Sequence, residues 1–429
     1  MTYEQATNYL FTRLPMFSRI GAAAYKKDLS NTLRLCEYLD NPHKKIKTIH
    51  IAGTNGKGST SHMLAAVLQT AGYKTGLYTS PHLRDFRERF RVNGEMIDKE
   101  FVVDFVKRIQ PAIDEIEPSF FEITVAMAFD YFVYKQIDVA VIETGLGGRL
   151  DSTNVVAPEV AVITNIGWDH MNLLGNTLPD IAFEKAGIIK SQVPVIIGET
   201  AAETKPVFEK VAAEKQAPLV FADKQRYVAE WKYEHHQLVL QVSPTGSDER
   251  TTYQLDLPGY YQTKNFITVL ETIHHLQKAG YKITDAHVHE ALKQVKKLTG
   301  LHGRWEVIHT NPVVVLDVGH NEDGIKQITA QIELSDHQHL HIVIGMVKDK
   351  EIEKVLALLP KEATYYFTRA QIPRALPETE LATRAQALGL NGHSYGDVNT
   401  ALQHAMGKAD KRDLIIVCGS VFVVGEVSL

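Results

Sequence analysis

The segment Gly53-Thr-Asn-Gly-Lys-Gly-Ser-Thr60 most constrains the fold of this chain, because it joins a short apolar run to a helical pattern through a glycine-rich turn. Lys47–Ala52 is typical of a buried strand, and residues 59–71 are typical of a helix. Glycines allow consecutive backbone N–H groups to close around phosphate oxygens, and the positive end of the helix dipole adds to that attraction. The pattern therefore predicts a phosphate-binding loop in which Lys57 supplies a cation for the terminal phosphates of a nucleotide.

The loop departs from the common phosphate-loop pattern at two positions. The first glycine of that pattern would fall at Ile51, and the residue after the lysine is Gly58, so the hydroxyl group arrives one position later, at Ser59. The strand and helix patterns on either side favour a nucleotide site over an ordinary glycine turn. The residues predicted to bind the nucleotide are Gly53, Thr54, Asn55, Gly56, Lys57, Gly58, Ser59 and Thr60.

Short apolar runs alternate with helical patterns on both sides of a glycine-containing stretch near residue 300. This alternation predicts a mostly parallel sheet in each half, with a β-hairpin excursion over residues 226–256. The predicted fold class is therefore α/β, with a P-loop ATPase domain over residues 1–299 and a smaller, Rossmann-like α/β domain over residues 300–429. The expected strands are 47–52, 75–79, 138–143, 160–165, 193–197, 313–317, 340–345, 364–367 and 413–418, and the expected helices of the first half are 59–71, 99–117, 119–135, 178–188, 263–279 and 284–297.

Charge and cysteine content exclude several classes of protein. The formal net charge is −5 and the basic residues are scattered, so no nucleic-acid-binding surface is indicated. Cys36 and Cys418 lie almost a chain length apart, which supports neither a thiolate zinc site nor a disulfide framework. The N-terminus lacks the pattern of a signal peptide, and no apolar run approaches the roughly 20 residues that span a bilayer. We therefore expect a cytoplasmic protein without nucleic-acid or membrane partners.

Further motifs accompany the phosphate loop along the chain. They are Leu77-Tyr-Thr-Ser-Pro-His82, Phe86-Arg-Glu-Arg89, Glu143-Thr-Gly-Leu-Gly-Gly-Arg-Leu-Asp-Ser-Thr-Asn154, Asp169-His170, Leu173-Leu-Gly175, Glu184-Lys-Ala-Gly-Ile-Ile-Lys190, His302-Gly-Arg-Trp305, Asp317-Val-Gly-His-Asn-Glu-Asp-Gly324 and Cys418-Gly-Ser420. With the loop, these motifs resemble the folylpolyglutamate synthase branch of the Mur ligase superfamily, whose members form amide bonds between carboxylates and amino acids. Only 52 residues precede the loop, and a separate uridine-nucleotide domain would need about 80–100, so we expect no such domain.

The resemblance implies an ATP-dependent carboxylate–amine ligase. In such an enzyme the γ-phosphoryl group of ATP activates a carboxylate as an acyl phosphate, which the amine of L-glutamate then attacks. Catalysis of the first step consists mainly of positioning and of neutralising phosphate charge. The implied carboxylate substrates are dihydropteroate and tetrahydrofolates, and the implied assembly is a monomer. Two alternatives stay open here: a Mur-type ligase of another carboxylate, and a non-enzymatic P-loop nucleotide switch.

Glu143 is a candidate magnesium ligand by its position. It ends the apolar run 138–143 at the carboxyl edge where open α/β sheets bind ligands, and a carboxylate oxygen suits Mg²⁺. The resemblance adds Ser80 and His170 as protein ligands of two Mg²⁺ ions. It also implies that Lys185 is carbamylated, since CO₂ would invert its charge and provide an oxygen ligand for the second ion.

The resemblance also implies roles in binding ATP and glutamate. It places Asn265, Arg304 and Asp317 on ATP, with Arg304 at the phosphates across the gap between the domains and Asp317 near the ribose. It assigns His320 and Ser420 to the incoming glutamate.

The implied pterin pocket contains Phe121 and Asp151. Stacking on a flat aromatic ring gives Phe121 a physical reason to bind a pterin. The catalytic residues implied for the whole reaction are Lys57, Lys185 and His320.

Overall fold

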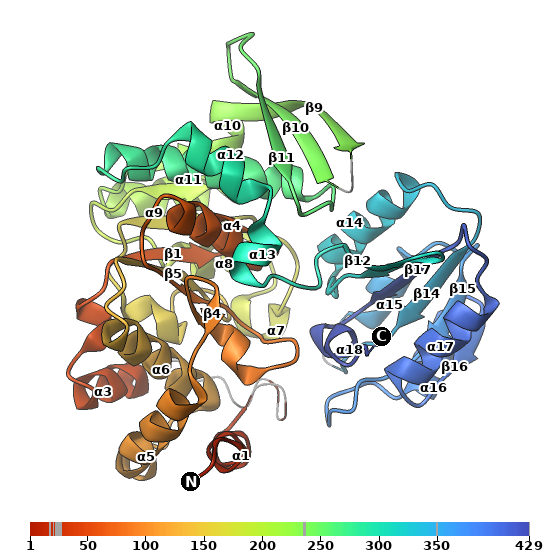
Figure 1. The fold of residues 1–429 in the computed structure, drawn as a ribbon, viewed down its shortest axis with the longest axis horizontal. Coiled ribbons are helices and arrows are strands. Elements are labelled where there is room, and N and C mark those ends of the chain that lie inside the picture. The colour runs from red at the N-terminus through yellow and green to blue at the C-terminus, as the bar shows by residue number, and fades with distance from the viewer. Residues whose placement is uncertain (17–18, 20, 22–27, 235–236, 349–350, 429) are drawn as a thin grey trace. The chain divides into compact units, whose positions relative to one another are not determined.

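The computed structural model describes residues 1–16, 19, 21, 28–234, 237–348 and 351–428, and its ribbon is drawn in Figure 1. The chain divides into two compact units. The first comprises Met1–Gly167, Met171–Asp256 and Tyr261–Leu301, and the second comprises Trp168–His170, Leu257–Tyr260 and His302–Leu429. Among the described residues, no helix is both long enough and apolar enough to cross a bilayer.

The first unit is built around a sheet with the strand order β4-β3-β2-β5-β1-β6-β7-β8. Strands from β2 to β8 in that order pair in parallel, whereas β3 and β4 form an antiparallel edge. The central strands are buried along their whole length, as expected when helices cover both faces. The strands are β1 (Thr48–Ala52), β2 (Thr75–Tyr78), β3 (Phe90–Val92), β4 (Glu95–Met96), β5 (Val139–Glu143), β6 (Val160–Ile163), β7 (Val195–Ile197) and β8 (Leu219–Phe221).

Helices cover both faces of this sheet (Figure 1). On one face, side chains of α5 and α6 pack with those of β2 and β5 in a large apolar cluster. Helix α6 starts where it does because Ser119 and Glu122 form a reciprocal capping box. The helices of the unit are α1 (Tyr3–Arg13), α3 (Ser30–Tyr38), α4 (Lys57–Thr70), α5 (Lys99–Ile116), α6 (Phe120–Tyr134), α7 (Met171–Leu174), α8 (Leu178–Ala186), α9 (Lys205–Glu214), α10 (Ala222–Gln225), α11 (Gln262–Lys278), α12 (Asp285–Leu292) and α13 (Val295–Thr299), with 3₁₀ turns η2 (Pro42–Lys44), η3 (Phe86–Arg89) and η4 (Ser152–Val155).

Two expectations for the first unit need correction. The predicted hairpin over residues 226–256 is a small sheet of order β11-β10-β9, in which β9 (Arg226–Glu234), β10 (Gln237–Pro244) and β11 (Thr251–Leu255) pair antiparallel. Residues 235–236, between β9 and β10, lie outside the described residues. The helix expected over 284–297 is two helices, α12 and α13, because the backbone leaves the helical region at Gln294.

The second unit contains a sheet with the order β12-β13-β17-β14-β15-β16. All of its neighbouring strands are parallel except β12, which pairs antiparallel with β13. The α/β fold class with two mostly parallel sheets is therefore confirmed. The elements are β12 (Glu306–Thr310), β13 (Val313–Leu316), β14 (Leu340–Ile344), β15 (Thr364–Phe367), β16 (Gly392–Ser394), β17 (Leu414–Cys418), α14 (Glu322–Glu333), α15 (Ile352–Leu356), α16 (Glu378–Ala387), α17 (Val398–Lys408) and α18 (Val421–Gly425).

A buried histidine at the centre of β1 makes the first unit sensitive to acid. The His50 ring is fully buried, its Nε2 lies 2.8 Å from Thr153 Oγ1, and burial lowers its pKa to about 3. In the unfolded chain the pKa is about 6.5. Below that pH the unfolded state binds a proton that the folded state does not, so stability falls as the pH falls from about 6.5 towards 3.

We predict that His50→Gln reduces this acid sensitivity, because glutamine can still donate to Thr153 but does not titrate. Between pH 7 and pH 5 the variant should lose about 2 kcal/mol less free energy of unfolding than the unmodified chain, measured by urea titration. The exposed His393 provides a matched control, and His393→Gln should behave like the unmodified chain. An equal loss in the His50 variant and the unmodified chain would contradict the prediction.

Candidate nucleotide and ligase site

The neighbouring parallel strands β2, β5, β1 and β6 end at one edge of the first sheet. Ser80 lies two residues after β2, Glu143 is the last residue of β5, the glycine-rich loop follows β1, and Thr164 follows β6. Ligands bind at this carboxyl edge in open α/β sheets. The topology thus brings the predicted loop beside two of the predicted metal ligands.

The loop is held by the residues that follow β6. The backbone N–H of Thr54 donates to the Asn165 carbonyl (3.0 Å), and that of Asn55 donates to Asn165 Oδ1 (2.9 Å). Thr164 Oγ1 donates to the Asn55 carbonyl at 2.5 Å, and a β-carbon at Gly53 would overlap this hydroxyl oxygen. Only glycine fits at position 53. The sequence analysis did not identify Thr164 and Asn165 as site residues. Their position, as two polar residues directly after a buried strand, could have indicated it.

Two lysine side chains converge on one backbone oxygen of the loop. Lys57 Nζ donates to the carbonyls of Gly53 (3.0 Å) and Thr54 (3.1 Å). Lys185, in the last turn of α8, is buried and also donates to the Gly53 carbonyl, at 3.0 Å. Two ammonium groups beside one oxygen repel each other, and burial strengthens that repulsion. The structure therefore places the predicted catalytic lysines together.

Ser80 and Glu143 contact each other at the carboxyl edge of the sheet, next to the strand that precedes the loop. The Ser80 N–H donates to Glu143 Oε2 at 3.2 Å, and the carboxylate is buried. The hard oxygen donors of a serine and a glutamate fit Mg²⁺, which takes its other ligands from water and phosphate. Within the described ranges, no group of three or more His, Cys, Asp or Glu side chains could hold a metal, so the full ligand set stays a prediction.

A buried arginine supports this contact. Arg89 Nε donates to His82 Nδ1 (2.8 Å), and the Arg89 carbonyl accepts from the Thr79 N–H (3.2 Å). Burial lowers the pKa of the Arg89 guanidinium, while the charges of nearby groups such as Glu143 raise it. The arginine was visible in the sequence as part of a motif, but its role was not.

Phe121 and Asp151 both hold the turn that follows β5. The half-buried Phe121 ring lies so close to Gly145 that a β-carbon there would be 2.5 Å from Phe121 Cζ. Asp151 caps η4 by accepting from the Thr153 N–H (3.0 Å), and it accepts from the Leu146 N–H (2.8 Å). Burial raises the pKa of Asp151, and the hydrogen bonds from Thr153 and the Leu146 backbone oppose that shift. The two predicted pterin residues thus contact the same turn.

In the second unit, the predicted residues gather at the carboxyl ends of β13 and β17, which are parallel neighbours. The Asp317 carboxylate is buried and accepts from the backbone N–H groups of Trp305 and Gly319, each at 2.9 Å. Ser420 caps α18 by accepting from the Val423 N–H (3.1 Å). Arg304 Nη1 donates to the Gly303 carbonyl at 3.1 Å.

Asp169 links the two histidines with predicted roles. Its carboxylate lies 3.5 Å from His320 Nε2 and 3.8 Å from His170 Nε2, and it accepts from Asn321 Nδ2 at 3.0 Å. His320 Nδ1 lies 2.9 Å from the Val318 carbonyl, so both ring nitrogens face oxygen acceptors. The sequence places Asp169 in a motif without indicating this linking role. His170 belongs to the second unit, whereas Ser80, Glu143 and Lys185 belong to the first.

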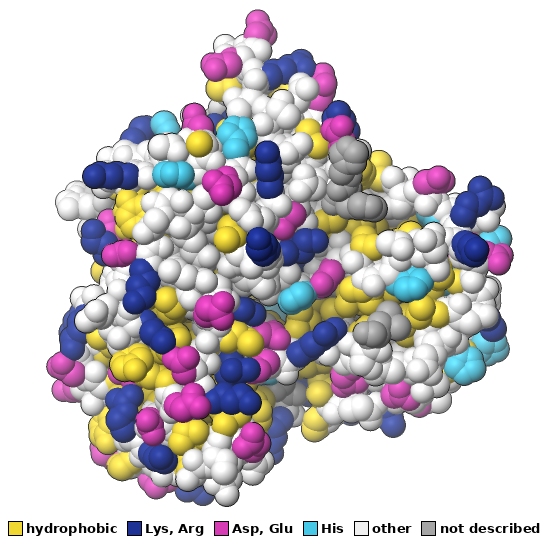
Figure 2. All heavy atoms as spheres, in the orientation of Figure 1, with side chains coloured by type: hydrophobic (Ala, Val, Ile, Leu, Met, Phe, Trp, Pro, Cys, Tyr) yellow, Lys and Arg dark blue, Asp and Glu magenta, His cyan; other side chains and the backbone are white. Residues whose placement is uncertain are grey.

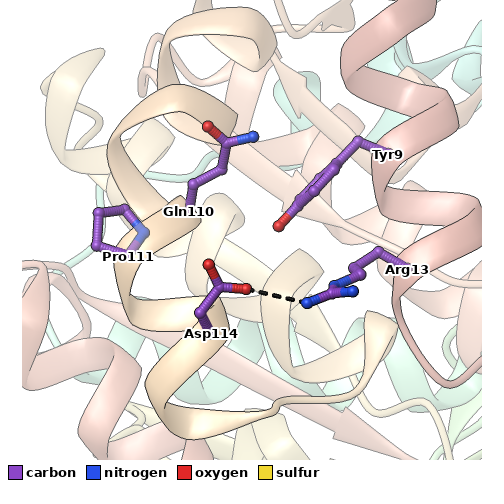
Figure 3. Close-up of a pocket in the computed structure, with 5 residues that line it drawn as sticks. All are labelled: Tyr9, Arg13, Gln110, Pro111 and Asp114. Carbon is purple, nitrogen blue, oxygen red and sulfur yellow. Dashed lines mark hydrogen bonds and ion pairs between the residues drawn. The ribbon is translucent and has the colours of Figure 1, made fainter.

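A pocket elsewhere in the first unit contains none of these residues. Figure 3 shows Tyr9 and Arg13 of α1 facing α5, with an ion pair of 3.3 Å between Arg13 and Asp114. On the face drawn in Figure 2, basic and acidic side chains are interspersed.

Two family models and several known proteins match this chain. The Mur ligase middle domain matches residues 51–273, and the Mur ligase glutamate ligase domain matches residues 303–421. The dihydrofolate synthase/folylpolyglutamate synthase of Bacillus subtilis is 32% identical, over 99% of this chain and 98% of the relative. A probable bifunctional folylpolyglutamate synthase/dihydropteroate synthase of Haloferax volcanii is also 32% identical over 99% of this chain, which spans only 50% of that relative.

Solved structures share the fold of the whole chain. Escherichia coli FolC in complex with DHPP and ADP has a TM-score of 0.83 and 31% identity, covering 99% of this chain and 96% of that one. A bifunctional folylpolyglutamate synthase/dihydrofolate synthase with Mn, AMPPNP and L-glutamate bound has a TM-score of 0.82 and 29% identity, covering 99% and 97%.

These matches confirm the predicted enzyme class, an ATP-dependent ligase of an acid and an amino acid. A middle-domain match over half of the chain and a 32% identical relative along nearly all of it establish the relationship. The chain belongs to the Mur ligase family, in its folylpolyglutamate synthase/dihydrofolate synthase branch.

Proposed function

We propose that this chain joins L-glutamate to the carboxylate of a dihydropteroate or tetrahydrofolate substrate, with ATP as the source of the activating phosphoryl group. The observation that carries the proposal is the phosphate loop at the carboxyl edge of the sheet, with Glu143 and Lys185 beside it. The ligands in related structures support it, since one contains DHPP and ADP and another contains AMPPNP and L-glutamate.

The chemistry requires two steps that balance without any other reactant. A carboxylate oxygen attacks the γ-phosphorus of ATP, and ADP leaves. The amine of glutamate, after losing its proton, then attacks the acyl carbon, and phosphate departs with the former carboxylate oxygen. Lys57 and the loop N–H groups would stabilise the negative charge of the transferring phosphoryl group, the largest contribution that a protein makes to such a reaction.

Mg²⁺ would neutralise phosphate charge when bound. We propose Ser80, Glu143 and His170 as its protein ligands, with a carbamylated Lys185 serving a second ion. The two ammonium groups at Gly53 support the modification, because a carbamate at Lys185 would replace a repulsion by an attraction towards Lys57. The carbamate N–H could still donate to the Gly53 carbonyl.

We assign the remaining residues by their match to motifs of the folylpolyglutamate synthase branch. Asn265, Arg304 and Asp317 would bind ATP, His320 and Ser420 would hold the incoming glutamate, and Phe121 and Asp151 would bind the pterin. The contacts of Asp151, Asp317 and Ser420 with backbone N–H groups support a joint role, in which each side chain also fixes the loop that binds the substrate. The monomeric state stays a prediction.

The main test is an ADP-release assay with the purified chain of residues 1–429. We expect ADP release that requires both L-glutamate and dihydropteroate or a tetrahydrofolate, and that falls at least about 100-fold in Lys57→Ala, because a charge opposing the phosphoryl group is lost. Uridine-linked muramyl peptides should not support it. Release that needs neither acid nor amine would favour a nucleotide switch, and release with the muramyl peptides alone would move the chain to another ligase branch.

The geometry at Gly53 predicts that alanine is not tolerated there. Gly53→Ala should abolish Mg-ADP binding measured by calorimetry, because the added β-carbon would displace Thr164 Oγ1 from the loop. Gly280 is a matched control, since it also has a positive φ but an added β-carbon there would meet no atom within 4 Å. Gly280→Ala should cost only about 1 kcal/mol of stability and bind Mg-ADP normally. Normal binding by the Gly53 variant would contradict the loop assignment.

A carbamate at Lys185 can be observed without measuring activity. With ¹³C-bicarbonate, the chain without substitutions should show a carbamate carbon signal by NMR. That signal should be absent in Lys185→Ala. Lys190 is the matched control, because burial lowers its pKa and its Nζ donates to the Asn154 carbonyl at 2.9 Å. The signal should persist in Lys190→Ala.

Activity provides a second readout for the same site. Lys185→Ala should be severely impaired, and acetate should restore part of the turnover by replacing the carbamate. Loss of the carbon signal in the Lys190 variant, or full activity in the Lys185 variant, would overturn the assignment.

A further inference from the structure

Gln262, the first residue of α11, is completely buried although its side chain is an amide. Burial of an amide without hydrogen-bond partners is costly, so the contacts of this side chain indicate what it does. Its Nε2 donates to Ser59 Oγ at 3.0 Å, and its Oε1 accepts from Asn265 Nδ2 at 2.8 Å. Both partners are predicted to bind the nucleotide, and they come from different segments of the chain.

Asn265 in turn packs directly on the loop. A β-carbon at Gly56 would overlap Asn265 Oδ1, and Gly56 has a φ of +81° as the residue that precedes α4. Residues 262 and 265 lie three apart on α11 and therefore project from the same side of that helix. Gly56 and Ser59 likewise lie three apart and bracket Lys57. Helix α11 thus contacts the phosphate loop on both sides of its lysine.

We infer that Gln262 is a positioning residue that couples the loop to the nucleotide-binding amide of Asn265. Its N–H occupies one lone pair of Ser59 Oγ, so the hydroxyl proton and the other lone pair point away from Gln262. Its carbonyl oxygen fixes which way the Asn265 amide faces. One side chain, that of Gln262, therefore orients both Ser59 in the phosphate loop and Asn265 on α11. This inference rests on the proposed nucleotide role of the loop.

The Gln262→Glu variant separates the two hydrogen bonds. A carboxylate can still accept from Asn265 but cannot donate to Ser59, so Ser59 must turn to donate instead. We expect Mg-ADP to bind about 10- to 100-fold more weakly, the usual effect of losing a group that orients a ligand-binding side chain. The KM for the pteroate acid and the KM for glutamate should change less than about threefold, a split that a general loss of structure would not produce.

A double-mutant cycle with Ser59→Ala tests whether Gln262 acts through Ser59. The double variant Ser59→Ala/Gln262→Glu should bind Mg-ADP no more weakly than Ser59→Ala alone, because the coupling is already lost. Thr272 is the matched control, since it is also buried in α11 but its hydroxyl donates within the same helix, to the Thr268 carbonyl (2.8 Å). Thr272→Val should bind Mg-ADP as the unmodified chain does.

The outcomes distinguish this inference from the proposed function. Calorimetry on chains of residues 1–429 gives each affinity for Mg-ADP, and circular dichroism establishes that each variant is folded. If Gln262→Glu does not fold, Gln262→Met, which keeps the volume of the side chain but removes both hydrogen bonds, replaces it as a single variant and should also bind Mg-ADP more weakly. Unchanged affinity in the Gln262 variant, or fully additive losses in the double variant, would overturn the positioning role. Failure of the unmodified chain to bind Mg-ADP would instead overturn the nucleotide site itself.

Discussion

The carbonyl oxygen of Gly53 accepts hydrogen bonds from two lysine ammonium groups, those of Lys57 and Lys185. It does so at a position where only glycine fits, since Thr164 fills the space of a side chain. This single peptide group ties the end of β1 to the first turn of α4 and to the last turn of α8. The position of the predicted catalytic lysines, and with them the charge of the site, depends on it.

A few polar side chains both hold the loops of the site in place and are proposed to bind its substrates. Asp151 caps η4 and accepts from the turn after β5, and Asp317 holds the backbone of Trp305 and Gly319. Asp169 connects His170 and His320 within the second unit. Because the loops are fixed by the groups proposed to bind substrates, substitutions there would disturb position and chemistry together.

The sequence was sufficient for the strand–loop–helix at the nucleotide site and for most strands of both sheets. These features are local, since apolar runs and glycines act within a few residues of each other. The expected strands did not include β3, β4, β8, β12 and β16, all of which lie at or near the edges of their sheets. The break between α12 and α13 was missed because neither glycine nor proline marks it. The supporting contacts were also hidden, because Thr164 and Gln262 meet the loop from 109 and 203 residues away. Only a folded chain brings such residues together.

In the proposed reaction, the phosphate loop directs the γ-phosphoryl group of ATP onto a carboxylate. The most direct measurement uses dihydropteroate labelled with ¹⁸O in its carboxylate, followed by mass spectrometry of the phosphate released during glutamate ligation. An acyl phosphate requires that one labelled oxygen leave with phosphate, so we expect one ¹⁸O in each phosphate formed. Phosphate without label, formed at the same rate as the amide product, would contradict it.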